Sequence, residues 1–260
     1  MKVLCIDIGN TNVNYGIIAA QTTFEVGSFS TKQFKDSPHF LTEFHKLIQG
    51  RDFDAISFCS VVPNLNSAMR AILEPSNKPI FQLTHETNKG IRLNYPKPSE
   101  VGHDRIANAI AVKSYHTIPA IIIDMGTAIT FDIITDNGYE GGVIAPGLGL
   151  MTQYLNEQTA LLPELTDADL VSPIEGFGTS TIQAMQLGVS VGFSGMVEAL
   201  LKHISNALIA NGYNEPIVLT TGGSTTNLTQ NWNNQTQFVA NLTLIGLASA
   251  YECATKDCCN

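Results

Sequence analysis

The stretch "IDIGNTNVNYGII", from Ile6 to Ile18, decides the fold that we expect for this chain. It begins as an apolar run, breaks at Gly9 into small polar residues and becomes apolar again, which predicts two strands joined by a tight turn. Glycine beside asparagine and threonine leaves backbone N–H groups open, and such turns bind phosphate oxygens. Asp7, at the end of the first strand, could hold a hydrated Mg²⁺ that bridges phosphates. Ordinary tight turns have the same composition, so one copy leaves both interpretations open.

A second copy of this pattern occurs further along the chain. "IDMG" at 123–126 repeats "IDIG", with Asp124 standing 117 residues after Asp7, and Thr127 matches Thr11 if one residue is skipped. Because aspartate, glycine and threonine recur together between apolar strands, we interpret the chain as a duplicated β-sheet domain. Two such hairpins facing one cleft could hold a nucleotide triphosphate from both sides.

Strand-like runs are followed by helical ones in both halves, which places the chain in the α/β class. We expect an N-terminal domain over residues 1–114 and a C-terminal domain over 115–260, with no low-complexity linker between them. A third glycine cluster, "TTGGST" at 220–225, ends a predicted strand. It is either a place where adenosine approaches or an ordinary strand-to-helix turn.

Composition argues against several classes of protein. The chain has 260 residues, 44% of them apolar, and its net charge of −9 argues against a general binder of nucleic acid or anionic membranes. We find no apolar run of transmembrane length and no signal peptide. The five cysteines form no disulfide framework, and Cys5 and Cys59 are expected to be packed thiols. A reducing, cytoplasmic location is therefore expected.

The stretch "VGHDRIANA" at 101–109 carries the most chemistry. Asp104 and Arg105 lie at the start of a predicted helix, where an acidic residue complements the helix dipole, so capping accounts for Asp104. Alternatively, Asp104 is a base that accepts a proton from a substrate hydroxyl, and Arg105 anchors an anionic substrate. Spacing alone leaves both open and leans towards capping. His103 is expected at the rim of a site, because no second His or Cys stands at metal-ligand spacing.

Taken together, these motifs resemble the type III pantothenate kinases, a family of the actin-like ATPase superfamily. The first motif alone indicates only an actin-like ATPase, whereas Gly-x-Asp-Arg with an upstream Tyr and Pro-x-x-Val-Gly is far more specific. The resemblance covers nearly the whole chain in the same order, through "DIGNTN" at 7–12, "VVPN" at 61–64, "YPKPSEVGHDRIAN" at 95–108, "DMGTAIT" at 124–130, "GGVIAPG" at 141–147 and "TSTIQAMQLG" at 179–188.

The resemblance implies two actin-like (RNase H-like) domains, each with a mixed β-sheet flanked by helices, and ATP in the cleft between them. It implies ATP-dependent phosphorylation of pantothenate to 4′-phosphopantothenate, the first step of coenzyme A biosynthesis. Mg²⁺ would accompany ATP, K⁺ or NH₄⁺ would activate, and the enzyme would be a homodimer. Few Lys or Arg residues lie in the phosphate motifs, so loop N–H groups and cations would have to neutralise the nucleotide.

The resemblance also assigns residues. Asp104 matches the catalytic base, and Asp124 matches the ligand of the monovalent cation. The stretch "GTST" at 178–181 departs from the usual family pattern and leaves open whether Thr179 or Thr181 contacts substrate across the dimer interface, although the downstream spacing favours Thr181. The matched pantothenate positions are Tyr95, Gly102, His103, Asp104, Arg105 and Thr181, and the matched ATP positions are Asp7, Ile8, Gly9, Asn10, Thr11, Asn12, Val13, Asn14 and Thr127.

Two alternatives remain beside this interpretation. One is another actin-like kinase that phosphorylates a sugar or a similar small alcohol. The other is a non-enzymatic regulatory accessory protein on the same fold.

Overall fold

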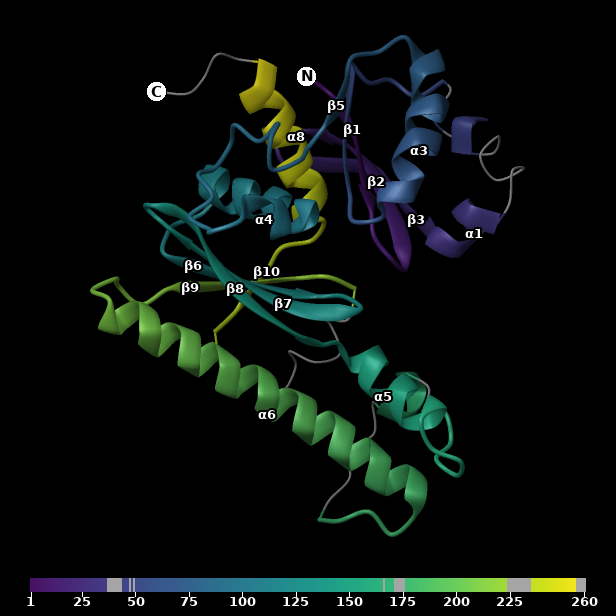
Figure 1. The fold of residues 1–260 in the computed structure, drawn as a ribbon, viewed down its shortest axis with the longest axis vertical. Coiled ribbons are helices and arrows are strands. Elements are labelled where there is room, and N and C mark those ends of the chain that lie inside the picture. The colour runs from purple at the N-terminus through teal and green to yellow at the C-terminus, as the bar shows by residue number, and fades with distance from the viewer. Residues whose placement is uncertain are drawn as a thin grey trace. The chain divides into compact units, whose positions relative to one another are not determined.

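The structure is a computed structural model that describes residues 1–36, 44–46, 48, 50–165, 167–170, 176–223 and 235–255. It contains two compact units, which are described separately (Figure 1). The predicted domain boundary between residues 114 and 115 stays a prediction. Unit 1 comprises Met1–Ile118, Ile134–Gly141 and Asn241–Asn260, of which 241–255 are described, and unit 2 comprises Pro119–Ile133 and Gly142–Ala240.

Unit 1 is built on a five-stranded sheet in the order β3-β2-β1-β4-β5. β1 pairs antiparallel with β2 and parallel with β4, so the sheet is mixed. The predicted strand–turn–strand at the start of the chain is therefore present as β1 and β2. The strands are β1 (Val3–Ile8), β2 (Asn12–Ala19), β3 (Thr22–Ser30), β4 (Ala55–Ser60) and β5 (Ile80–Gln82).

The two faces of this sheet differ in chemistry because side chains alternate along each strand. One face carries Leu4, Ile6 and Ile8 into an apolar core with Phe58. The other face carries polar side chains such as Asp7 and Ser57 beside apolar ones such as Val3. Helix α8 covers this face, since the Ser57 hydroxyl donates to the Leu247 carbonyl at 2.8 Å. The helices with described bounds in unit 1 are α1 (Thr31–Asp36), α3 (Asn66–Leu73), α4 (His103–Tyr115) and α8 (Leu242–Thr255), with 3-10 turns at Pro63–Leu65, Glu74–Ser76 and Pro98–Glu100.

Helix α4, which carries the Gly-x-Asp-Arg stretch, is held closely against α8. A Cβ atom at Gly246 would collide with the backbone carbonyl of Ala107, so glycine is needed where the helices cross. The Thr243 hydroxyl also donates to the buried Asn108 side chain at 2.8 Å. These contacts hold α4 against α8.

Unit 2 contains most of a second sheet, in the order β10-β9-β6-β7-β8, of which residues 134–141 group with unit 1. β6, β7 and β8 have 6, 8 and 9 residues, the same lengths as β1, β2 and β3. The equal lengths and the matching strand order support the predicted duplication. The strands are β6 (Ala120–Met125), β7 (Ala128–Thr135), β8 (Gly138–Pro146), β9 (Ile217–Thr221) and β10 (Gln237–Phe238).

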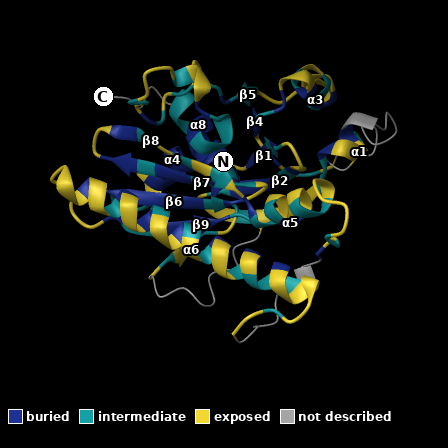
Figure 2. Cartoon of the chain, turned by 60° about the horizontal axis from the view of Figure 1, so that its bottom comes forward, coloured by how far each residue is buried: buried dark blue, intermediate teal, exposed yellow. Residues whose placement is uncertain are grey.

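Helix α6 (Thr181–Ala210) packs one stripe on this sheet and leaves its other side exposed (Figure 2). By length and composition alone it could cross a membrane, a test that the core helix of a soluble protein also passes, whereas we expected no apolar run of that length. Packing of this helix face on the sheet explains the apolar composition of α6 only in part, because 28% of the most apolar 18-residue segment of the helix is buried. Among the described residues, unit 2 also contains α5 (Leu148–Glu157) and a 3-10 turn at Asp167–Leu170.

Candidate functional site

The turn between β1 and β2 is tied to the start of α1. The Gly9 N–H donates to the Asn12 carbonyl at 2.9 Å, which closes the turn. The Thr31 hydroxyl donates to the Gly9 carbonyl at 2.7 Å, and the Thr31 N–H donates to the Thr11 carbonyl at 2.8 Å. These bonds hold the predicted phosphate-binding turn in place, with the side chains of Asn10, Thr11 and Asn12 exposed and those of Ile8 and Val13 buried.

Asp7 lies at the end of β1, between a donor on each neighbouring strand. The pairing register places Asn14 of β2 and Cys59 of β4 beside it. The Asn14 amide donates to Oδ2 of Asp7 at 3.4 Å, and the Cys59 thiol donates to Oδ1 at 3.4 Å. Burial raises the pKa of the Cys59 thiol well above its usual value, and the charges of Asp7 and Asp104 raise this pKa further. The thiol therefore keeps its proton and acts as a donor.

The start of α4 is anchored at the same end of this sheet. Nδ1 of His103 lies 3.0 Å from the carbonyl oxygen of Ser60, the last residue of β4. A carbonyl only accepts, so Nδ1 carries the hydrogen and Nε2 is the acceptor of the neutral ring. Because Ser60 directly follows Cys59, whose thiol donates to Asp7, the contact of His103 places the start of α4 near the Asp7 end of β1.

The structure bears on both interpretations of Asp104. The residue at the N-cap is Gly102, yet Oδ1 of Asp104 accepts the Arg105 N–H at 2.8 Å in the first helical turn. The carboxylate thus satisfies a helix N–H without being the N-cap residue. A Cβ atom at Gly102 would lie 2.5 Å from that Oδ1, which explains why glycine stands two residues before the aspartate.

Arg105 and Tyr95 both lie next to the Tyr139 ring, a residue that the sequence did not mark as part of the site. The Arg105 guanidinium carbon lies 5.9 Å from the centroid of the Tyr139 ring, which is 6.4 Å from the Tyr95 ring. The Tyr139 N–H donates to the Arg92 carbonyl at 2.9 Å, and the Asn94 N–H donates to the Tyr139 carbonyl at 2.9 Å. The loop that carries Tyr95 is therefore held on the start of β8. The only signal in the sequence was the "DNG" turn at 136–138, which indicates a hairpin and nothing about the ring.

The second hairpin, in unit 2, is closed in a similar way. The Gly126 N–H donates to the Ala128 carbonyl at 3.2 Å, and the Gly147 N–H donates to the Thr127 carbonyl at 3.1 Å. Asp124 is half-buried at the end of β6, and Thr127 is exposed in the turn. Gly222 has a φ of +97°, and a Cβ atom there would lie 2.6 Å from the Met125 carbonyl oxygen. Gly222 of the third glycine cluster therefore packs against this hairpin.

The departure at 178–181 lies at the start of α6. Ser180 is the N-cap, and its side chain accepts the Gln183 N–H. The Thr179 N–H and hydroxyl both donate to the Gln183 side chain, at 3.0 and 2.7 Å. Thr181 is exposed in the first helical turn. The engaged hydroxyl of Thr179 supports Thr181 as the substrate contact, which stays a prediction.

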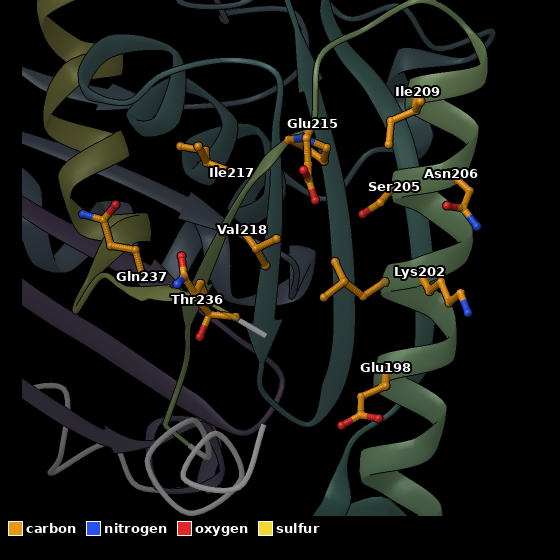
Figure 3. A pocket seen from close by; sticks show the side chains of 13 residues that line it. Glu198, Lys202, Ser205, Asn206, Ile209, Glu215, Ile217, Val218, Thr236 and Gln237 are labelled. Atoms are coloured by element: carbon orange, nitrogen blue, oxygen red, sulfur yellow. The ribbon is translucent and has the colours of Figure 1, made fainter. Parts of the chain in front are cut away.

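No dedicated metal cage marks the chemistry in the part of the chain that the structure describes. No group of three or more His, Cys, Asp or Glu side chains is placed there to hold a metal ion. A cavity of about 870 Å³ lies between the second half of α6 and strands β9 and β10 (Figure 3). It is lined by residues such as Lys202 and Glu215, and no residue of the predicted site lines it.

Comparisons with known proteins agree with the resemblance. A family model described as type III pantothenate kinase matches residues 3–203. A type III pantothenate kinase of Roseiflexus sp. (strain RS-1) is 34% identical over 262 residues, which cover 96% of this chain and 98% of that protein.

Solved structures show a similar fold. A conserved Baf family protein from Campylobacter jejuni has a TM-score of 0.62 at 19% identity and covers 96% of this chain and 97% of its own. A ROK family glucokinase from Streptomyces griseus, in complex with glucose and AMPPNP, has a TM-score of 0.54 at 12% identity and covers 97% of this chain and 99% of its own. The expected α/β fold class, with two sheets flanked by helices, is confirmed.

Proposed function

Because the chain belongs to the type III pantothenate kinase family, and is therefore an enzyme that phosphorylates pantothenate with ATP, we propose a role for each group of residues described above. The sugar-kinase and regulatory alternatives gain no support. The solved glucokinase and Baf family structures are 12% and 19% identical, so they show the fold alone.

Asp104 is the general base of the reaction. Its Oδ1 is held by the Arg105 N–H, which fixes the carboxylate in the first turn of α4. A carboxylate in this position takes the proton of the primary hydroxyl as the hydroxyl oxygen forms its bond to the γ-phosphorus of ATP. The bond from that phosphorus to the β,γ-bridging oxygen breaks, and ADP leaves. The single observation that carries this role is the anchoring of the start of α4 on Ser60 by His103, at 3.0 Å, directly after Cys59, whose thiol donates to Asp7.

Pantothenate is a carboxylate, and Arg105 is the cation placed to bind it. The Tyr139 ring beneath the guanidinium orients Arg105. Tyr95, whose ring lies beside Tyr139, contacts the same substrate together with Gly102 and His103.

The two hairpins bind the ATP phosphates through their backbone N–H groups, with Thr127 as a further contact. Asp7 fits a hydrated Mg²⁺, because one carboxylate suffices for an ion that keeps most of its waters. When bound, Mg²⁺ supplies positive charge to the phosphates. Asp124 fits the monovalent cation, K⁺ or NH₄⁺, since its carboxylate is half-buried at the end of β6.

The chain works as a homodimer, and we also propose a cytoplasmic location. Unit 2 exposes several large apolar side chains on and near the starts of α5 and α6, a pattern that marks interaction surfaces. A partner there places Thr181 in the neighbouring subunit's substrate site. The exposed fractions are 39% for Leu150, 67% for Tyr154, 90% for Leu161, 81% for Phe177, 44% for Ile182 and 62% for Val191.

The test of the catalytic role is Asp104→Asn, assayed by ADP release with pantothenate. Asparagine keeps an oxygen for the Arg105 N–H, so the fold is expected to persist while kcat falls about 10²- to 10⁴-fold. Glu100→Gln is the matched control, because it removes a nearby exposed carboxylate that pairs with Lys97 at 3.1 Å. A kcat of Asp104→Asn close to that of the control would refute the role. Loss of the K⁺ over Na⁺ preference in Asp124→Asn tests the cation site.

Mixed dimers test the shared site. Asp104→Asn and Thr181→Ala are each expected to be impaired alone. Mixing them produces heterodimers in which one of the two sites has both native residues. Recovery of activity on mixing supports the dimer and Thr181 together, and no recovery from chains shown to exchange subunits would contradict them.

A further inference from the structure

The Asp7 carboxylate is held from both sides of its strand by neutral donors. Pairing of β1 with β2 places Asn14 beside Asp7, and pairing with β4 places Cys59 on the other side. The thiol donates to Oδ1 and the amide to Oδ2, each at 3.4 Å. At this distance the thiol contact is of ordinary length for sulfur, whereas the amide contact is long for nitrogen. The thiol contact of Cys59 is therefore a normal hydrogen bond for its donor type.

The chemistry of these donors suits a carboxylate that must stay negative. A Lys or Arg at either position would form an ion pair with Asp7 and compete with any cation brought by the nucleotide. A protonated thiol orients one carboxylate oxygen and adds no charge. Cys59 has no exposed surface, so water does not compete for this contact.

We propose that Cys59 is a positioning residue for the nucleotide site, which holds Asp7 through an S–H···Oδ1 hydrogen bond so that the carboxylate receives the hydrated cation of ATP already oriented. The proposal rests on the proposed function of Asp7. Cys59 acts through Asp7 and touches neither substrate nor phosphate.

Cys5 is a buried thiol in the same sheet that has no contact with a carboxylate in the described structure, so it serves as the comparison for Cys59. It lies on β1 two residues before Asp7, it also has no exposed surface, and its thiol faces the Val3 carbonyl at 3.7 Å. Burial alone raises the pKa of the Cys5 thiol, without a contribution from a carboxylate. Cys5→Ala therefore removes the same volume from the same sheet without removing a bond to Asp7.

The first measurement is infrared spectroscopy of the S–H stretch in the nucleotide-free protein. The difference between wild type and Cys59→Ala isolates the Cys59 band, and the difference between wild type and Cys5→Ala isolates the Cys5 band. We expect the Cys59 band at lower frequency than the Cys5 band, and we expect Asp7→Asn to move it to higher frequency. A Cys59 band that Asp7→Asn leaves in place would overturn the proposal.

The second measurement is binding of AMPPNP at increasing Mg²⁺ concentration, followed by calorimetry without turnover. We expect Cys59→Ala to raise the half-saturating Mg²⁺ concentration about 5-fold, given the modest net worth of one such hydrogen bond. Cys59→Ser, which keeps a donor, is expected to restore part of the loss, and Cys5→Ala to match wild type. Equal effects of Cys59→Ala and Cys5→Ala would overturn the proposal.

These results are distinguishable from failure of the proposed function. A wild-type chain that binds AMPPNP but does not phosphorylate pantothenate would refute the proposed function, while the infrared shift and the Mg²⁺ dependence would still decide the role of Cys59.

Discussion

Gly102→Ala is the sharpest test of how the backbone positions Asp104. The φ of −55° and ψ of 137° at Gly102 are open to alanine, so the main chain need not change. The new Cβ atom would lie 2.5 Å from Oδ1 of Asp104, below the 3.0 Å that real Cβ contacts respect, so the carboxylate must move by about 0.5 Å or more. Since a misplacement of about 1 Å can lower a rate on the order of 10²-fold, we expect kcat to fall about 10- to 100-fold.

The assay is ADP release with saturating ATP and varied pantothenate, accompanied by thermal unfolding. Replacement of an N-cap glycine by alanine is expected to lower the free energy of unfolding by about 1 kcal/mol at most, so the loss of activity should exceed any loss of fold. Gly149→Ala, near the start of α5, is the matched control, because an added Cβ there meets nothing within 4 Å. If Gly102→Ala keeps a kcat within about 2-fold of that control, the close approach does not position the carboxylate and the reasoning is wrong.

Three further predictions concern single side chains. Tyr139→Leu removes the ring beneath Arg105 and should raise the KM for pantothenate about 3- to 10-fold while the KM for ATP stays constant; parallel rises in both would contradict the proposed platform. Gly222→Ala places a Cβ atom against the Met125 backbone at a φ of +97°. Urea unfolding should show a decrease of about 2–4 kcal/mol in the free energy of unfolding, and no decrease would mean that the turn adjusts freely. Burial lowers the pKa of His116, so just below about pH 6.5 the unfolded chain binds more protons than the folded chain. The free energy of unfolding should therefore fall as pH falls through that window. His116→Gln should flatten this pH dependence of the free energy of unfolding, and an unchanged pH dependence would exclude His116 as its source.

Much of the fold was predictable from local pattern. The alternation of apolar and polar residues around Gly9 indicated β1, its turn and β2, and the second copy around Gly126 indicated β6 and β7. Such signals are local, because a strand, a tight turn and a helix start are specified by residues a few positions apart. The Gly-x-Asp spacing also had a local cause, the approach of the Gly102 backbone to the Asp104 carboxylate.

The sequence by itself determined the two hairpins, the helix that begins at His103 and the family to which they belong, because each depends on neighbours in the chain. Only the tertiary structure decided which side chains surround them. Cys59 reaches Asp7 across 52 residues, and Tyr139 lies under Arg105, because strand register and packing are set by contacts far apart in sequence. A run such as "SFCSVV" has the same composition whether its thiol packs in an apolar core or donates to a carboxylate, and only the strand paired beside it distinguishes the two.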